Sequence, residues 1–70
     1  MSEKERIGLH IVEARERLGL NQSEFARELG ISRTGLHLYE SGKRIISTDV
    51  LLKIYDKFNV TPNEILIAED

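Results

Sequence analysis

Apolar residues recur along most of the chain with the spacing of one face of an α-helix. In the first third, four of them follow one another at intervals of four, three and four residues: Ile7, Ile11, Ala14 and Leu18. This single apolar stripe predicts a helix over Lys4–Leu18 that buries one side, with Gly19 as the residue that ends it. Gly8 lies inside this pattern and weakens it, since glycine costs about 1 kcal/mol against alanine in a helix interior.

A second, shorter helix is expected directly afterwards. Asn21 can cap its start, and Glu24, three residues later, can reach back to the cap in a capping box. Three apolar residues then share a face: Phe25, Ala26 and Leu29. Gly30 ends the helix, because glycine adopts the left-handed terminal conformation without penalty.

A third helix follows almost at once. Ser32 is its N-cap, and the helix should run over Arg33–Glu40 and close at Gly42. Two helices of about eight residues joined this tightly cannot lie antiparallel, so they must cross steeply, which is helix-turn-helix geometry. We therefore take the stretch from about 21 to 42 as the centre of the fold.

The third helix has two chemically different faces. Its inward face holds Leu36, Tyr39 and Glu40, and its outward face holds Arg33, Thr34, His37, Leu38 and Ser41. An inward carboxylate needs a partner, because burying an unpaired charge is costly. Arg15 lies at the edge of the first apolar stripe, and we predict that it forms an ion pair with Glu40. The alternative is that both side chains are solvated.

Two further helices complete the chain. Ser47 caps a helix over Thr48–Phe58, with a core stripe formed by Leu51, Ile54, Tyr55 and Phe58. Thr61, Pro62 and Glu64 form a strong start signal for a short helix over Pro62–Ile67, followed by an acidic tail at 68–70. With no strand signal, the sequence predicts one compact, all-α, five-helix domain covering residues 1–70.

The distribution of charge matters more than its total. The net charge is −2, but residues 1–44 carry eight Lys and Arg against seven Asp and Glu, whereas residues 45–70 carry two against five. Arg33, Lys43 and Arg44 gather around the third helix, and the local field decides phosphate attraction within a Debye length of about 8 Å. This predicts a weakly basic surface at that helix.

Other classes of protein are disfavoured by composition. There is no cysteine, and His10 and His37 lack the spacing of metal ligands, so we expect no metal or cofactor and expect both histidines to face solvent. Neither a signal peptide nor a membrane-spanning apolar run is recognisable. We expect a soluble, cytoplasmic protein without a membrane partner.

Taken together, the residues resemble a known family. The matching residues are Arg15, then 17–22, Phe25 and Ala26, 29–33, 39–44, Leu51 and Leu52, and 59–62. In this order and spacing they are similar to the phage repressor/Cro-type helix-turn-helix domains, also called the xenobiotic-response-element family, and the similarity runs from Gly8 to Leu66. It implies a lambda-repressor-like fold and an internal salt bridge between Arg15 and Glu40, in agreement with the pairing predicted above.

The resemblance also implies a DNA-binding surface. It places the third helix in the major groove of DNA, with nine residues at the interface: Gln22, Ser32, Arg33, Thr34, Gly35, His37, Leu38, Lys43 and Arg44. Gln22 matches a phosphate-binding position, and Lys43 and Arg44 match a loop that meets the DNA backbone. Gly35 stands where the family usually has a small polar residue, and Leu38 where a polar base reader is common.

Each of these roles has an alternative. Arg33 either recognises a guanine edge or contacts a phosphate or solvent, and Thr34 contacts DNA or only supports the helix start. Gln22 binds phosphate or is an exposed first-turn residue. His37 faces the groove or solvent, and Gly35 either permits close backbone approach or is a neutral loss of a side chain.

Apolar residues near the C-terminus suggest an interface. Ile65 or Leu66 should enter the core. The remaining members of the group Ile45, Ile46, Leu66 and Ile67 cannot all be buried in so small a domain, and exposed apolar clusters mark interfaces. We predict a symmetric homodimer through Ile46, Leu66 and Ile67, which would set two recognition helices about 34 Å apart on a palindromic site. The alternative is that these residues complete the core.

The leading functional hypothesis is a sequence-specific DNA-binding transcriptional regulator, acting as a repressor. The alternative is an antitoxin-like or other protein-interaction module of the same fold, which has a protein partner and binds DNA weakly or only with that partner. An enzyme is disfavoured, because Ser32, His37 and Asp49 do not have the spacing of a nucleophile, a base and an orienting group.

Overall fold

The computed structural model describes residues 1–67, and within them the chain forms five α-helices and no strand. The helices are α1 (Glu3–Arg17), α2 (Gln22–Leu29), α3 (Arg33–Glu40), α4 (Thr48–Phe58) and α5 (Pro62–Leu66). The all-α architecture expected from the sequence is confirmed. The bounds of α2, α3 and α4 agree with the prediction. The helix α1 begins and ends one residue earlier than expected, and α5 ends one residue earlier. The acidic tail lies outside the described residues.

Side-chain caps fix where each helix begins. The five N-caps are Ser2, Asn21, Ser32, Ser47 and Thr61. Three of these are full capping boxes, in which Glu5, Glu24 and Glu64 return a hydrogen bond to the cap backbone. Each cap satisfies N–H groups that the first helical turn leaves without partners. Local sequence therefore determines where each helix begins.

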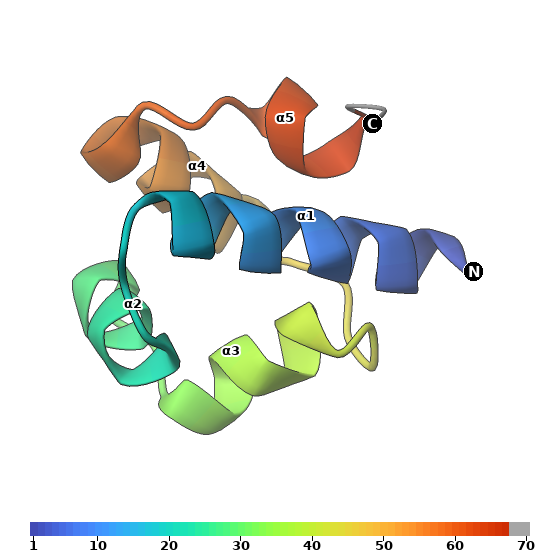
Figure 1. Cartoon of the computed structure of the whole chain (residues 1–70), viewed down its shortest axis with the longest axis horizontal. Coiled ribbons are helices and arrows are strands. Elements are labelled where there is room, and N and C mark those ends of the chain that lie inside the picture. The colour runs from blue at the N-terminus through green and yellow to red at the C-terminus, as the bar shows by residue number, and fades with distance from the viewer. Residues whose placement is uncertain (68–70) are drawn as a thin grey trace.

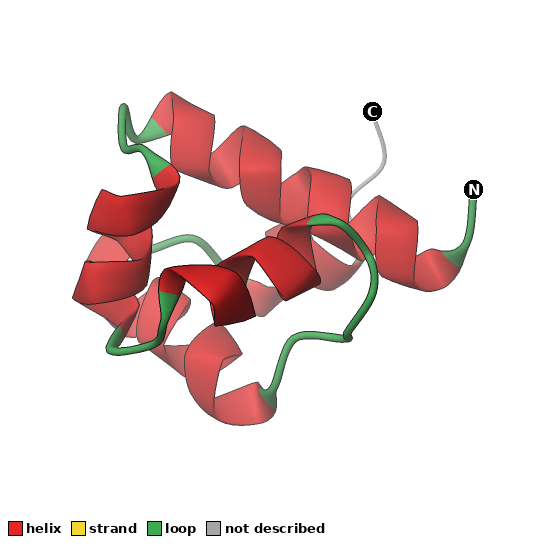
Figure 2. Cartoon of the chain, turned by 90° about the horizontal axis from the view of Figure 1, so that it is seen from below, coloured by secondary structure: helices red, strands yellow, loops and turns green. Residues whose placement is uncertain are grey.

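The longest helix, α1, packs against α3 and α5, and α2 packs against α3 (Figure 1). The helix α3 lies along one side of it and α5 along the other, while α4 contacts α2 and α5. Seen from below, α2 crosses α3 steeply, as the short connection between them requires (Figure 2). None of the helices within residues 1–67 has both the length and the apolar character needed to cross a membrane.

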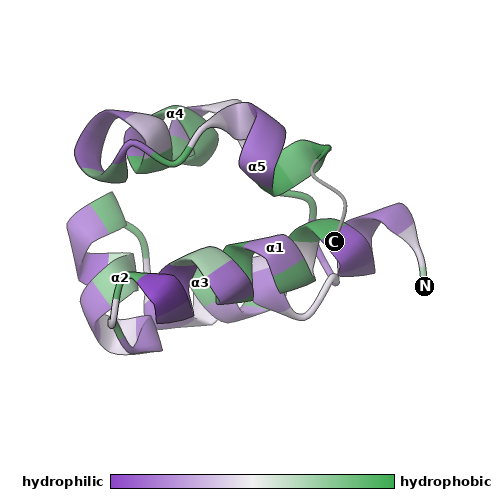
Figure 3. Cartoon of the chain, turned by 45° about the horizontal axis from the view of Figure 1, so that its top comes forward, coloured by the Kyte–Doolittle hydropathy of each residue, from purple (hydrophilic) through white to green (hydrophobic). Residues whose placement is uncertain are grey.

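The core draws on all five helices. Its largest fully buried side chains are Ile11, Phe25, Leu29, Leu36, Ile54 and Ile65. Hydrophilic residues colour much of the outer surface of each helix (Figure 3). Because α2, α3 and α5 are too short to be stable alone, burial of these side chains is what holds the helices in place.

Most of the core stripe predicted for α4 is buried: Leu51 and Ile54 are 8% and 0% exposed, and Phe58 packs against the core. One member of the stripe is not buried. Tyr55, predicted to lie in the core, is 47% exposed, whereas Val50 is 5% exposed. Ile46, predicted at a dimer interface, is 8% exposed and belongs to the core. Ile46 and Leu51 occupy the two positions of a hydrophobic staple around the Ser47 cap, and both are 8% exposed. The dimer prediction is wrong for Ile46.

The expectation that His10 faces solvent is also wrong. His10 is 7% exposed, and its Nδ1 lies 2.8 Å from the backbone oxygen of Ile65. A carbonyl oxygen only accepts, so Nδ1 carries the hydrogen and donates it. The last carbonyls of a helix lack intrahelical partners, and His10 of α1 satisfies one of them at the end of α5. The second histidine, His37, is exposed as expected.

Candidate nucleic-acid interface

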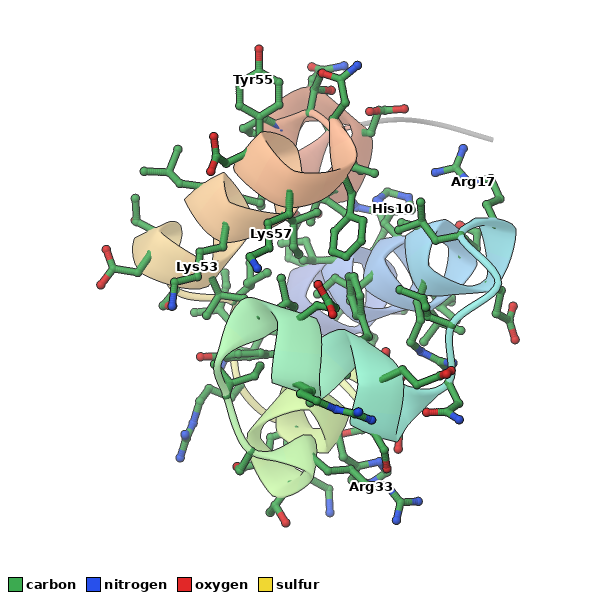
Figure 4. The ribbon with its side chains drawn as sticks, turned by 90° about the vertical axis from the view of Figure 1, so that its left-hand side faces the viewer. His10, Arg17, Arg33, Lys53, Tyr55 and Lys57 are labelled. Atoms are coloured by element: carbon green, nitrogen blue, oxygen red, sulfur yellow. The ribbon has the colours of Figure 1, made fainter. Side chains whose placement is uncertain are left out.

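The outward face of α3 is polar and accessible. Arg33, Thr34 and His37 are exposed, and they line an open hollow of about 230 Å³ together with Gln22 from the start of α2. The Arg33 side chain points away from the body of the protein, at the end opposite Tyr55 (Figure 4). The two short helices thus bring four hydrogen-bonding side chains to one accessible surface.

The first turn of α3 adds backbone donors to this surface. The Ser32 hydroxyl accepts a hydrogen bond from the Gly35 N–H at 2.9 Å and thereby caps the helix. The N–H groups of Arg33 and Thr34 precede the helical hydrogen-bond ladder and have no intrahelical partner. Together with the partial positive charge of the helix start, they favour an anionic neighbour beside the Arg33 side chain.

Two more cations lie at the opposite end of α3. Lys43 and Arg44 are exposed, and their backbone N–H groups both bond to the Leu38 oxygen, at 3.1 and 3.2 Å. These bonds fold the chain tightly after α3 and hold the two residues beside its C-terminal turn. Exposed positive side chains therefore lie near both ends of α3, although the protein is acidic overall.

The inward face of α3 is anchored by the predicted ion pair. Arg15 Nε lies 2.8 Å from Glu40 Oε2, and Arg15 Nη2 lies 3.3 Å from Glu40 Oε1. The two side chains are 14% and 4% exposed, so the solvated alternative is wrong. A further bond from Arg15 Nη1 to the Leu20 oxygen, at 2.9 Å, ties the same guanidinium to the chain entering α2.

Gln22 joins this ion pair, which the sequence did not indicate. Its Nε2 donates to Glu40 Oε1 at 2.8 Å, so the amide orientation is fixed by a carboxylate that can only accept. Glu40 thus receives hydrogen bonds from α1 and α2 while belonging to α3. Gln22 keeps a second amide hydrogen beside the hollow, and its contact with phosphate stays a prediction.

The other predicted site residues are divided between surface and interior. Leu38 and Gly35 are half-buried on α3, and Leu66 is half-buried against the core. Ile67 is 62% exposed. Sequence reasoning also missed Gly8 and Gly42, which lie where α1 meets the C-terminal end of α3. A glycine inside a helical stripe was the available signal for Gly8, because such a residue often marks close packing.

This geometry agrees with comparison to known proteins. The family model for the helix-turn-helix matches residues 11–65. The chain belongs to this helix-turn-helix family. Its type is that of the phage repressor and Cro domains, and the family is one of DNA-binding regulators.

Curated relatives of this helix-turn-helix chain have more than one role. It is 44% identical over 64 residues to a protein named antitoxin PezA of Streptococcus pneumoniae, covering 91% of this chain and 40% of PezA. It is 37% identical over 60 residues to the transcriptional regulator ImmR of Bacillus subtilis, covering 86% of this chain and 47% of ImmR. The chain therefore spans less than half the length of these relatives.

A solved structure matches the helix-turn-helix chain along nearly its whole length. It is the restriction-modification controller protein C.AhdI of Aeromonas hydrophila, with a TM-score of 0.83 and 26% sequence identity. The match covers 93% of this chain and 98% of C.AhdI. The five-helix arrangement is thus the arrangement of a known controller protein.

Proposed function

We propose that this chain is a sequence-specific DNA-binding transcriptional regulator that represses from a palindromic operator as a homodimer, with α3 in the major groove. The observation that carries the proposal is the division of α3 into two faces. Arg33, Thr34 and His37 are exposed, while Leu36 and Glu40 of the same helix are 1% and 8% exposed. A helix held from behind and polar in front is suited to groove recognition.

Each residue of the exposed face has a proposed partner on DNA. Arg33, at the start of α3, donates two hydrogen bonds to a guanine edge, and Leu38 packs on a thymine methyl group. Thr34 and His37 contact the groove beside them. Phosphates are bound by the second amide hydrogen of Gln22 and, at the other end of α3, by Lys43 and Arg44. Ser32 and Gly35 bring the start of the helix close to the duplex.

The proposed homodimer uses the apolar surface near the end of the described chain. With Ile46 in the core, the proposal rests on Ile67, which is 62% exposed, and on the half-buried Leu66. A two-fold axis through this surface would relate two α3 helices by about one turn of duplex, or 34 Å. Two half-sites bound together would offset the weak basicity of each domain.

A second candidate function is that of an antitoxin-like domain whose main partner is a protein. It is favoured by the 44% identity to a protein named antitoxin PezA, which exceeds the 37% identity to the regulator ImmR. The net charge of −2 points the same way, because it weakens non-specific attraction to DNA. In that case DNA binding would need the partner or be secondary to it.

Selection of bound sequences from a random duplex library tests the proposal. We expect a palindromic consensus, and affinity that falls linearly with salt on a logarithmic scale. Arg33→Ala should relax the preference at one base pair per half-site and cost about 1–3 kcal/mol of discrimination there. The matched control is Arg17→Ala, an exposed arginine remote from Arg33 (Figure 4).

The outcomes separate the two candidates. An unchanged preference in Arg33→Ala would overturn the role of that residue, and a consensus without two-fold symmetry would overturn the homodimer on a palindrome. If the wild-type chain enriches no sequence and shows no salt-dependent binding, the antitoxin-like function is favoured instead.

A further inference from the structure

The backbone of α1 touches the backbone of α3 at Gly8. A Cβ atom added there would lie 2.5 Å from the Glu40 oxygen and 2.7 Å from the Tyr39 oxygen. Both obstacles are main-chain atoms at the end of α3, so neither can move without moving the helix. A glycine hydrogen takes this space instead and faces the carbonyls, a weak contact that recurs at helix–helix interfaces.

A second glycine makes the reverse contact nearby. Gly42, in the turn after α3, has a φ of +79°, and a Cβ there would lie 2.8 Å from Glu5 Cα and 2.9 Å from Glu5 N. Gly8 and Glu5 lie on successive turns of α1. The C-terminal end of α3 and its following turn therefore pack closely against the backbone of the first two turns of α1.

We propose that Gly8 is a positioning residue for DNA recognition, because it sets how closely the end of α3 is seated on α1. This inference rests on the proposed function, in which α3 reads the groove. Glu40 connects the Gly8 contact to the candidate DNA-binding surface. Its backbone oxygen faces Gly8, and its carboxylate binds Arg15 and Gln22. Lifting Glu40 from α1 shifts the Gln22 amide and tilts α3, on which Arg33 is carried.

Gly8→Ala is expected to displace α3 from α1. In an open helix position, alanine stabilises by up to about 1 kcal/mol relative to glycine. Here the contact distances are shorter than real Cβ atoms show, and the obstacles are backbone. Alanine must therefore push α3 outward. Base-edge hydrogen bonds depend on its orientation, whereas phosphate attraction tolerates a small shift.

The test compares Gly8→Ala with Ile54→Val, a core change in α4, a helix whose main contacts are with α2 and α5. Affinity is measured for the duplex selected by the wild type and for an unrelated duplex, at low temperature where both variants are folded. We expect Gly8→Ala to bind the selected duplex about tenfold or more weakly, the loss of one good base contact, and the unrelated duplex within about twofold. Ile54→Val should keep the wild-type ratio of the two affinities.

A spectroscopic measurement tests, without DNA, whether Gly8 determines how α3 packs on α1. In nuclear magnetic resonance spectra, Gly8→Ala should shift the Gln22 side-chain amide and the backbone amides of Arg33 and Thr34. Ile54→Val should leave these signals in place. If the wild type binds no DNA, the proposed function fails, yet these shifts still decide whether Gly8 seats α3.

A second variant covers failure of the first to fold. Gly42→Asn retains the left-handed conformation, which asparagine tolerates, and so tests the Glu5 contact alone. Unchanged amide signals, or a Gly8→Ala protein with wild-type affinities, would overturn the proposal. An equal loss of specificity in Ile54→Val would also overturn it, and so would failure of both glycine variants to fold. In either case the α1–α3 backbone contact would serve stability only.

Discussion

The α1–α3 contact and the α2–α4 contact hold their helices together in different ways. Between α1 and α3, an ion pair at 2.8 Å has side chains that are 14% and 4% exposed, and Gly8 brings the backbones into contact. Between α2 and α4, the ion pair of Lys57 and Glu28 is 3.9 Å long, with side chains 47% and 51% exposed. Beside it the rings of Phe25 and Phe58 pack with centroids 5.5 Å apart.

The difference shows what each contact specifies. Apolar rings at α2–α4 contribute burial but tolerate small rotations, because hydrophobic attraction is not directional. Short hydrogen bonds and a backbone contact at α1–α3 accept one geometry only. The directional contact lies behind the helix that carries the candidate DNA-binding residues. The tolerant one lies behind α2, whose own register is fixed by its cap.

The largest effect is expected from Glu40→Ala. Removing this carboxylate leaves the Arg15 guanidinium buried without its partner and releases Gln22, at a cost of about 3–5 kcal/mol. For a chain of this size that is a large share of the total free energy of unfolding. Urea denaturation followed by circular dichroism measures it.

A milder change at the same position sharpens the result. Glu40→Gln keeps the shape and one acceptor but removes the charge, and its unfolding midpoint should fall between those of the wild type and Glu40→Ala. An unchanged midpoint in Glu40→Gln would mean that the ion pair is not what anchors α3.

The next effect is expected at the aromatic pair. Phe58→Leu preserves most of the apolar volume but removes the ring–ring contact with Phe25, and should cost about 1 kcal/mol. Its signature is local: amides of α2 and α4 should exchange faster with solvent, while those of α3 keep their protection. If α3 loses protection equally, the two contacts are not independent and the comparison fails.

Local signals account for what the sequence predicted well. The caps Asn21, Ser32, Ser47 and Thr61, and the left-handed end at Gly30, are decided within one helical turn, so the bounds of the helices followed from them. The Arg15–Glu40 pair could also be inferred, because a charge on an apolar face requires a partner.

What the sequence did not predict depends on contacts between distant segments. His10 is buried only because the end of α5 arrives beside it, 55 residues later in the chain. Val50 and Tyr55 lie on different sides of the apolar stripe of α4, and the packing of α4 against the other helices decides which of them is buried. The bond from Gln22 to Glu40 required the crossing of α2 and α3 to be known.

A small effect is expected at the exposed ion pair. Lys57→Ala should change the free energy of unfolding by less than about 0.5 kcal/mol, because solvent screens the pair and fixing two long side chains costs entropy. Thermal unfolding at low and high salt measures it, and the difference from the wild type should vanish at high salt. A loss above about 1 kcal/mol would mean that this ion pair stabilises the α2–α4 contact more than a solvent-screened pair can.

The smallest effect is expected from acid, at the capping box of α5 on the opposite side of α1 from α3. Hydrogen bonds from the Thr61 backbone and hydroxyl hold the pKa of Glu64 below its usual 4.5. The folded state therefore binds the proton less readily than the unfolded state. The resulting stabilisation is present above the unfolded pKa and is lost as the pH falls through the folded one.

Glu64→Gln should accordingly lose less stability than the wild type between about pH 6 and about pH 3.5. Thermal midpoints across that range measure the difference, with Glu13→Gln, at an exposed position of α1, as the control for removing one charge. Parallel curves for the wild type and Glu64→Gln would show that the capping carboxylate does not contribute to the stability of the fold.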